Sequence, residues 1–525
     1  MTERRYPVIP PTETRPSRPI SFVVVRFCDD YLHNALQSPC LHHGLNQLIT
    51  VDNTANLSFF NLSSAINAGI VDAHNEIIAI VHEDVVLPEG WQACFEDSLS
   101  ELERSDPSWG VLGAVGWTAD GEVVGHYSDP HTYCNTFAGA RFAAVPRLDE
   151  QILIIRRSSK LCFDENLPSI HNLGRDLPLT AASRGLRTYV VDAPTIHKYA
   201  DERGRLIVRK EDSPKINERT SYAYRAEQEL SDGYLVQKWP GVIISRYKPD
   251  QASNTSHSKH VQEALDSPTI LFSRGDEGSR LLSALAQDAG LFLGNATNNL
   301  GESVELMLAV YKAVIAKHRC RADGQREAII AELRRAAAQM LEQSSAPTSW
   351  GFNVQENMLV IPELARAFPR ARFVHLNCDP LRTSLGPVCQ SAKLDNQIGR
   401  VALPVAYEFC GLEPSQIFLD PSPLHMSYTT IHQTTEVLDH AGGLPAKRYL
   451  EIRFEELIKE AARTRTSFCD WLGTKTTGHT LEGSIDCCRL ATPRTPLSPE
   501  IEREVACILK PLRDRLGYGG CRPAV

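Results

Sequence analysis

The chain has 525 residues, a formal net charge of -9 and a pI near 6.0, with 42% hydrophobic and 23% charged residues. This length accommodates two or more domains, and the acidic balance argues against a nucleic-acid partner. No apolar run approaches the roughly 20 residues that cross a bilayer, and residues 1–19 are polar and proline-rich, unlike a secretory signal. We expect a disordered 1–19 segment and a cytoplasmic protein without a transmembrane segment, for which peripheral membrane contact stays open.

Short apolar runs bounded by turn residues alternate with helical patterns in the first half. The expected strands are Ile20–Val25, Gln47–Val51, Ile77–Val81, Val111–Gly116, Ile152–Ile155 and Thr188–Val191, and the expected helices are Phe59–Ala73 and Trp91–Arg104. Strands joined by crossover helices predict one doubly wound α/β domain over 20–245.

A polar stretch at 246–268 predicts a linker. The second half begins again with a strand, a glycine-containing loop and a helix. The expected elements are strands Thr269–Ser273, Arg372–Asn377 and Tyr449–Arg453, with helices from Ser279 to about Ala289, near 302–318 and at 323–343. They predict a second α/β domain over 269–490, which a helical tail at 491–525 follows.

Polar residues follow several expected strands of the first half, where open α/β sheets bind their ligands. They are Asp52, Asn53, His82, Glu83, Asp84 and, somewhat further past its strand, His197. Carboxylate, imidazole and diphosphate oxygens together suit Mn²⁺ or Mg²⁺, and Asp84 and His197 are the candidate protein ligands. Taken singly, each residue is also compatible with a polar strand end or a hydrogen-bonded loop histidine.

The order of these segments resembles the family-2 glycosyltransferases of GT-A fold, especially a bacterial branch with an HxDV-x-LP-x-GW motif. The matching segments over residues 20–200 are VDNTAN at 51–56, SSAINAGIVDA at 63–73, HEDVVLPEGW at 82–91, LDEQILIIRRS at 148–158, FDENLPSIHNLGRDLPLTAASRG at 163–185 and APTIHKYAD at 193–201. The resemblance implies a nucleoside-contacting turn at Asp52 and Asn53, and donor contacts by His82 and Glu83. It also implies that Asp84 and His197 are the metal ligands.

Inverting sugar transfer needs a carboxylate that accepts the proton of the acceptor hydroxyl. The resemblance makes Asp176 the candidate general base, with Asp149 and Glu150 as reserve carboxylates. Asp176 alternatively stabilises the start of a helix through the dipole. Family members often carry a Glu-Asp pair where this chain has Gly174, Arg175 and Asp176.

The loop after Thr269–Ser273 aims backbone N–H groups and a helix N-terminus at an anion. Its candidate residues are Arg274, Gly275, Gly278, Ser279 and Arg280. The loop lacks the GK[ST] ending of a nucleotide-triphosphate P-loop. This half resembles sulfotransferases that use phosphoadenosine phosphosulfate (PAPS), on TILFSRGDEGSRLLSALAQDAG at 269–290, NNLGES at 298–303, WGFNVQENMLVIPELARAFPRARFVHLNCDPLRTSL at 350–385 and RYLEIRFEELIKEAARTRTSFCDWLG at 448–473.

The second half departs from that pattern where phosphate-binding side chains are expected. Asp276 and Glu277 stand in the loop, Asn353 replaces a lysine, Cys378 replaces an arginine, and the later serine position holds Gly386. We therefore predict weak or no PAPS binding. Arg274 and Arg280 either compensate or form ion pairs with Asp276 and Glu277. Glu302 is either a base or the start of the next helix.

The sequence predicts a metal-dependent glycosyltransferase that moves a sugar from a nucleotide-sugar donor to a glycan or lipid-linked acceptor. The resemblance places it in bacterial surface polysaccharide synthesis. Alternatives are a bifunctional glycosyltransferase and sulfotransferase that uses PAPS, and a non-catalytic scaffold with two degenerate sites.

Overall fold

The computed structural model describes residues 6–7, 9, 16–54, 58–59, 61–168, 171–201, 203–208, 218–242, 259–274, 276–319, 323–344, 349–394, 397–476, 481 and 498–519, with the backbone alone at 218–220, 259–260, 276–277, 323–325 and 446. The chain divides into unit 1, Met1–Ile216 with Gln228–Tyr247, and unit 2, Asn217–Glu227 with Lys248–Val525. Most of the expected disordered segment 1–19 lies outside the described residues.

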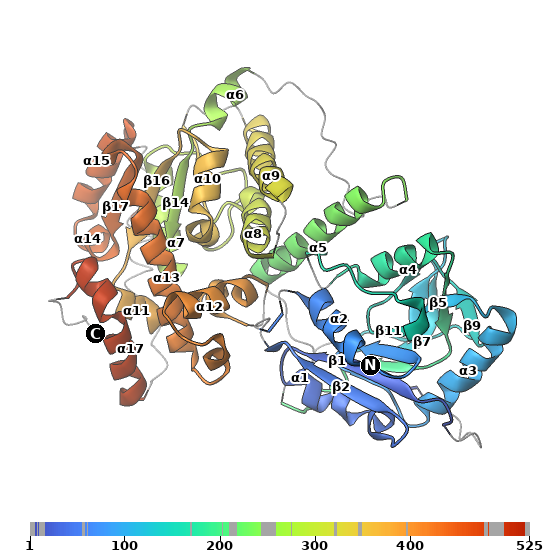
Figure 1. Cartoon of the computed structure of the whole chain (residues 1–525). Coiled ribbons are helices and arrows are strands. Elements are labelled where there is room, and N and C mark those ends of the chain that lie inside the picture. Colours follow the sequence, from blue (N-terminus) through green and yellow to red (C-terminus); the bar gives the residue numbers. More distant parts are fainter. Residues whose placement is uncertain are drawn as a thin grey trace. The chain divides into compact units, whose positions relative to one another are not determined.

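A seven-stranded sheet forms the centre of unit 1 (Figure 1), in the order β2-β1-β3-β11-β5-β12-β9. These strands are β1 (Ile20–Arg26), β2 (Gln47–Asp52), β3 (Ile77–Val81), β5 (Trp109–Gly113), β9 (Phe142–Ala144), β11 (Ile152–Arg156) and β12 (Arg187–Val191). β1 is parallel to β2 and β3, whereas β11 is antiparallel to both of its neighbours. The sheet is therefore mixed. The expected doubly wound α/β domain has parallel neighbours at β2-β1-β3 and β5-β12, and antiparallel neighbours at β11 and β9.

Alternate side chains of each strand point to opposite faces, so one strand serves two cores. Phe22 and Val24 join the core with α3 (Trp91–Ser105), while Val23 and Val25 join the core with α2 (Leu62–Asp72) and α4 (Leu173–Ser183). Along α3 the apolar residues Trp91, Phe95, Leu99 and Leu102 recur at helical spacing and are buried. Helices thus cover both faces of the sheet.

A second sheet has the order β10-β6-β7-β13-β4, with β8 paired to β7. Its strands are β4 (Val85–Val86), β6 (Val115–Trp117), β7 (Val123–Ser128), β8 (Tyr133–Asn135), β10 (Arg147–Leu148) and β13 (Thr195–His197). The prediction of a single strand over Val111–Gly116 is wrong, because the chain leaves the first sheet after Gly113 and enters the second at Val115. This second sheet positions the residues around Asp84.

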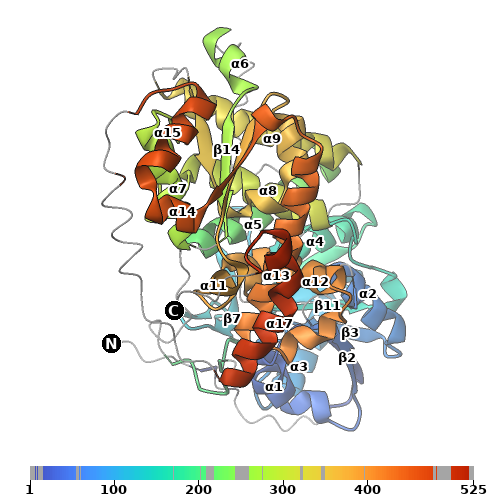
Figure 2. The same ribbon diagram turned by 90° about the vertical axis from the view of Figure 1, so that its left-hand side faces the viewer.

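Unit 2 contains a parallel sheet in the order β15-β14-β16-β17, formed by β14 (Thr269–Ser273), β15 (Gly351–Asn353), β16 (Arg372–Asn377) and β17 (Tyr449–Arg453). Figure 2 shows α7 (Asp276–Asp288), α14 (Phe454–Lys459) and α15 (Ala461–Leu472) on one side of β14, and α8 (Val304–Arg319) and α9 (Asp323–Glu342) on the other. The expected strands β14, β16 and β17 are confirmed.

Further helices connect or follow these strands. They are α10 (Ile361–Ala367), α11 (Pro380–Ser384), α12 (Gln397–Phe409), α13 (Ser422–Gly442) and α17 (Pro499–Arg515), with the short helix η7 (Gln390–Ala392). α6 (Lys259–Leu265) lies within the expected linker, and Trp350 donates to the carbonyl of Ala264 at 2.9 Å. The end of that stretch therefore belongs to unit 2.

α5 (Glu218–Lys238) contributes residues to both units. Among the described residues, no helix combines the length and apolar character needed to cross a membrane.

Candidate functional site

The loop after β3 carries the first group of polar side chains. Since β1, β2 and β3 are parallel, their carboxyl ends at Arg26, Asp52 and Val81 lie at one edge of the sheet, where ligands of such sheets bind. His82 and Asp84 occupy the short segment between β3 and β4 at this edge. The expected placement of both residues just past a strand is confirmed.

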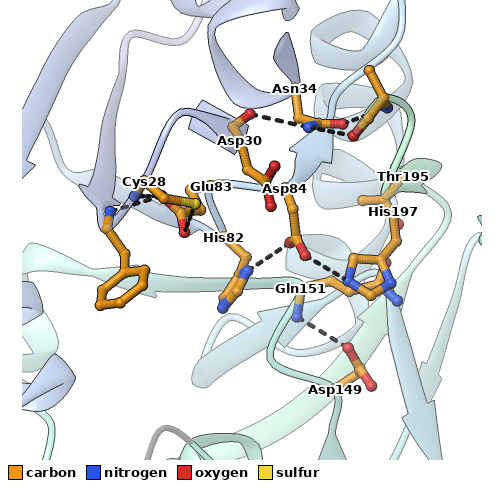
Figure 3. Close-up of polar contacts among 12 residues, drawn as sticks. Cys28, Asp30, Asn34, His82, Glu83, Asp84, Asp149, Gln151, Thr195 and His197 are labelled. Carbon is orange, nitrogen blue, oxygen red and sulfur yellow. Dashed lines mark hydrogen bonds and ion pairs between the residues drawn. The ribbon is translucent and has the colours of Figure 1, made fainter. Parts of the chain in front are cut away.

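Asp84 lies between two histidines (Figure 3). Its Oδ1 is 2.6 Å from Nδ1 of His82, and its Oδ2 is 3.2 Å from Nε2 of His197. Asp84 is 7% exposed, whereas the side chains of His82 and His197 are 35% and 26% exposed. Solvent therefore reaches this cluster at the imidazole rings.

The charges in the cluster stabilise one another. Burial acts to raise the pKa of Asp84, but the charges of His197 and His82 and their hydrogen bonds outweigh it and hold the pKa well below its usual value. Burial acts to lower the pKa of His82, yet the charge of Asp84 and the hydrogen bond to it raise that pKa to about 9. At neutral pH an ionised Asp84 thus accepts a hydrogen bond from a protonated His82.

Backbone pairing brings His197 to Asp84. β13 is antiparallel to β4, with His197 paired to Val85, and the N–H of Lys198 donates to the carbonyl of Asp84 at 2.7 Å. Lys198 has a φ of 51°, so the chain turns away directly after His197. The short β4–β13 ladder fixes the separation of the two side chains.

The Asp84–His197 pair has the separation expected of two neighbouring ligands of one metal ion. Metal–ligand distances of about 2.1 Å at a right angle place the ligand atoms about 3 Å apart, and Oδ2 and Nε2 are 3.2 Å apart. Across the described residues, no group of three His, Cys, Asp or Glu side chains has the arrangement of a metal site. Asp84 and His197 are therefore two candidate ligands without a third among the described residues.

Glu83 points away from this pair. Its Oε2 accepts the N–H groups of Phe27 and Cys28 at 2.7 and 3.1 Å (Figure 3). Burial raises the pKa of its carboxyl. Glu83 therefore ties the loop after β1 to the loop after β3, and the structure does not bring it to the expected donor-binding position.

The predicted nucleoside turn is described only in part, since residues 55–57 lie outside the described chain. Asn53 is buried, and its Oδ1 accepts the N–H of Phe59 at 3.0 Å, which shapes the turn. Asp52 is exposed at the carboxyl end of β2, and hydrogen bonding to Thr54 lowers its pKa. Of the two residues, Asp52 is the one placed to meet a ligand.

Asp176 lies in the first turn of α4 and is 3% exposed. Its Oδ2 accepts from Nζ of Lys238 at 2.8 Å, and its Oδ1 accepts from Nε1 of Trp239 at 2.7 Å. Lys238 also lies 2.7 Å from Asp164. The candidate base is thus held by α5 and the residue after it, an arrangement that sequence spacing does not reveal.

The reserve carboxylates lie between β10 and β11. Oδ1 of Asp149 accepts the N–H of Gln151, and Oε1 of Glu150 accepts the N–H of Asn172 at the start of α4. Burial, with the charge of Asp149, raises the pKa of Glu150 to about 7. Figure 3 shows Asp149 with Gln151 beside the Asp84 cluster, so this loop borders the candidate metal site.

In unit 2, Arg274 follows β14 and is 9% exposed. Its Nη1 donates to Oγ of Ser391 and Oε1 of Gln433, both at 2.8 Å. Its Nη2 donates to Oγ1 of Thr429 at 2.9 Å and of Thr430 at 3.4 Å. The guanidinium therefore reaches η7 and α13, partners that the sequence analysis missed. In the sequence, these partners are indicated by the polar residues Thr429, Thr430 and Gln433 within the α13 segment.

Neutral side chains contact α7 at Ser279 and Ser283. Ser279 is buried, and Nδ2 of Asn353 donates to its Oγ at 2.9 Å and to Oγ of Ser283 at 2.8 Å. Gly278 approaches the side chain of Ser273 closely. Arg280 is exposed and donates to a backbone carbonyl. Asn353 thus fills the expected lysine position with a side chain bonded to α7.

Gly275 lies outside the described residues, as do the side chains of Asp276 and Glu277. The expected ion pairs of Arg274 and Arg280 with those acids stay predictions. Glu302 is buried two residues ahead of α8 and accepts from Nδ2 of Asn298 at 2.8 Å, so it precedes the helix instead of starting it, and its role as a base stays a prediction.

Cys378 contacts α14, and the acid that follows it contacts the tail. Sγ of Cys378 lies 3.5 Å from Oε1 of Glu455. Both carboxylate oxygens of Asp379 accept from Arg513 of α17, at 2.8 and 2.9 Å. One cation at this segment, Arg513, therefore comes from the tail and is paired with an acid, a contact that the sequence does not predict. Arg382 is a second cation whose charge acts on Cys378.

Comparison with protein families matches residues 284–478 to the model of the Sulfotransferase family. Unit 2 therefore carries a sulfotransferase-family domain, as the sequence predicts. The match begins within α7, whose first two residues are Asp276 and Glu277, so these acids belong to the helix and not, as expected, to the loop before it. It does not extend to unit 1, so the glycosyltransferase assignment stays a prediction. No curated protein matches the chain.

Several solved structures with some similarity carry the name sulfotransferase. Sulfotransferase STF9 from Mycobacterium avium is 12% identical with a TM-score of 0.34, covering 58% of this chain and 87% of that one. The sulfotransferase domain from the curacin biosynthetic pathway is 14% identical with a TM-score of 0.26, covering 48% and 98%. The sulfotransferase from Alicyclobacillus acidocaldarius is 15% identical with a TM-score of 0.25, covering 47% and 94%. Nothing about the ligands of this chain follows from such low scores.

Proposed function

We propose that unit 1 is a metal-dependent glycosyltransferase that transfers a sugar from a nucleotide-sugar to a glycan or lipid-linked acceptor. The observation that carries the proposal is the Asp84–His197 pair at the carboxyl edge of the sheet, where Oδ2 and Nε2 are 3.2 Å apart. An ionised carboxylate beside an imidazole suits Mn²⁺ or Mg²⁺. The resemblance adds bacterial surface polysaccharide synthesis as the setting.

In this proposal Asp84 and His197 hold the metal ion, which neutralises charge on the departing diphosphate when bound. His82 donates to the other oxygen of Asp84, so the oxygen facing His197 keeps its direction. Asp52 lies at the same edge of the sheet, at the position proposed for nucleoside contact.

The base that deprotonates the acceptor comes from one of two places. Asp176 is the candidate from the resemblance, although Lys238 and Trp239 occupy its oxygens. Asp149 and Glu150 are the alternatives, and their loop borders the Asp84 cluster. A base needs an oxygen within hydrogen-bond reach of the acceptor hydroxyl, so Asp176 would accept that proton through a remaining lone pair, beside the hydrogen bonds from Lys238 and Trp239.

The test is a donor screen on the full chain. Release of nucleoside diphosphate is measured from a panel of nucleotide-sugars, with Mn²⁺, with Mg²⁺ and with chelator. Metal-dependent release from one or a few donors supports the proposal. Absence of release and of metal-dependent binding for the whole panel contradicts it.

A second candidate function is sulfuryl transfer by unit 2, which the family match over 284–478 favours. PAPS is the donor that this family implies. The neutral groups at Asn353 and Cys378 argue for weak donor binding, so we propose that sulfation is not the main activity. Unit 2 would then bind an acceptor or serve assembly.

A further inference from the structure

Arg274 carries a buried charge that no acid neutralises among the described residues. Its hydrogen-bond partners are three hydroxyls and one amide, on Ser391, Thr429, Thr430 and Gln433. Those four side chains are buried as well. Two partly buried arginines of unit 2 differ, since Arg513 and Arg319 each pair with a carboxylate.

A buried guanidinium with neutral partners is costly, because dipoles replace water only in part and the charge remains uncompensated. Most proteins avoid the arrangement by pairing the cation. A buried guanidinium without an acid is less costly where the anion of a bound ligand neutralises its charge.

One edge of the guanidinium is not fully used. Nε and Nη2 form the edge that binds oxyanions in two parallel hydrogen bonds. Nε of Arg274 has no hydrogen-bond partner in the described part of the chain. The same holds for Nε2 of Gln433, whose Oε1 accepts from Arg274. Two buried donors at this cation, Nε of Arg274 and Nε2 of Gln433, are therefore unpaired among the described residues.

We infer that Arg274 binds an oxyanion, a carboxylate or a sulfate group, on the substrate that unit 2 takes besides any nucleotide. Nε would donate to the oxyanion, which would replace Oγ1 of Thr430, 3.4 Å away, as an acceptor of Nη2, and Gln433 would add a neutral donor. Because the guanidinium ends on η7 and α13, its anion differs from the nucleotide phosphate that the loop before α7 would hold. The inference rests on the proposal that unit 2 binds an acceptor.

The experiment measures binding of radiolabelled inorganic sulfate to the full chain by equilibrium dialysis, at constant ionic strength set with NaCl. Sodium acetate is the competing carboxylate. The variants are Arg274→Gln, which removes the charge, and Arg274→Lys. The lysine keeps the charge but lacks the paired donors of the guanidinium. Arg463→Gln is the matched control, since the side chain of Arg463 is 82% exposed.

Saturable binding of one sulfate that acetate displaces is the expected result. Arg274→Gln should weaken it by roughly tenfold to a hundredfold, the usual contribution of a charged hydrogen bond. Arg274→Lys should weaken it as well, and Arg463→Gln should leave it unchanged. Absence of saturable binding in the parent, or equal binding in Arg274→Gln, overturns the inference.

Two further measurements cover the cases in which the Arg274 variants do not fold or the sulfate binds at the nucleotide site. If neither Arg274 variant folds, the Nε–H resonance of Arg274 in protein labelled at arginine Nε should shift on sulfate addition, and an unchanged spectrum overturns the inference. Adenosine 3′,5′-bisphosphate is titrated in parallel. If sulfate and this nucleotide displace one another, Arg274 belongs to the nucleotide site and the inference is wrong. Sulfate binding has no bearing on metal-dependent release by unit 1, so the two proposals fail independently.

Discussion

His197 Nε2 lies 3.2 Å from Asp84 Oδ2, although 113 residues separate them in the chain. Two features bring them together: the parallel strands that end at the His82–Asp84 loop, and the β4–β13 ladder that pairs His197 with Val85. The carboxylate is buried and ionised, and the imidazole is partly exposed. A buried anion beside an accessible nitrogen is an arrangement that attracts a cation from solvent.

Asp84→Asn should weaken Mn²⁺-dependent binding of a nucleoside diphosphate. The substitution keeps the shape and removes the charge, and a charged contact is worth roughly a factor of ten to a hundred. Calorimetry on the full chain with and without Mn²⁺ measures the effect. Asp72→Asn, at an exposed position of α2, is the control. Equal affinity in Asp84→Asn and the parent would remove Asp84 from the site.

His82 should act through the direction of one hydrogen bond. Its Nδ1 donates to Asp84, and the amide nitrogen of asparagine lies near the position of Nδ1, whereas that of glutamine lies near Nε2. We expect His82→Asn to retain most of the Mn²⁺ affinity and His82→Gln to lose roughly tenfold or more, the usual effect of a residue that orients a metal ligand. Electron paramagnetic resonance of free Mn²⁺ gives both affinities. If both variants bind like the parent, His82 does not position Asp84.

Glu150 should make stability depend on pH. Its folded-state pKa is raised to about 7 from 4.5, so between these values the folded chain binds more protons than the unfolded chain. Stability then falls as pH rises through this window. Denaturant unfolding should show that Glu150→Gln gains stability relative to the parent from pH 4.5 toward pH 7. A difference between the two proteins that is constant across the window would mean that Glu150 keeps an ordinary pKa.

The sequence predicts the central strands well because each is a short apolar run between turn residues. β3, β14, β16 and β17 have the predicted bounds. The strands β4 and β13, with two and three residues, have too little length for a periodic pattern, yet they place His197. The split between β5 and β6 was missed because all of Val111–Gly116 is buried, so burial alone does not mark the change of sheet.

The polar residues at the strand ends were predicted, but the direction of each side chain was not. Glu83 and Asp84 are adjacent in sequence, and one holds a backbone loop while the other meets His197. Likewise, Arg274 was expected to face the loop before α7, and its partners lie on α13. Such directions depend on contacts across more than a hundred residues, which spacing in one sequence does not encode.

Asp176→Asn should lower sugar transfer by about 10² to 10⁴ while donor binding changes little, if Asp176 is the base. The structure adds an expected loss of thermal stability, because Lys238 loses one of its two carboxylate partners. Turnover and unfolding temperature are measured together, with Asp164→Asn as the control, since it removes the other partner of the same lysine. Equal losses of turnover in the two variants would mean a structural role for Asp176. Asp149→Asn and Glu150→Gln would then be the next variants.

Unit 2 should bind adenosine 3′,5′-bisphosphate weakly or not at all. Three positions where the family pattern places cations hold Asp276, Asn353 and Cys378, and each missing charged contact is worth roughly 1.5 to 3 kcal/mol. Losing them together weakens binding on the order of a thousandfold or more, even without full additivity. The neutral amide of Asn353 offers no charge to a phosphate, and its Nδ2 already donates to Ser279 and Ser283.

Calorimetric titration of the full chain measures that affinity. A fragment that starts at residue 265 is unsuitable, because Arg319 of unit 2 pairs with Glu227 of α5. Micromolar affinity in the parent would contradict the prediction and favour a bifunctional enzyme. Asn353→Lys should strengthen binding roughly tenfold or more if only the missing charge limits it, whereas Lys475→Gln, at an exposed position outside these segments, serves as the charge control. A parent that binds weakly and an Asn353→Lys variant that gains affinity would together show that the fold keeps the shape of the phosphate site and lacks its cations.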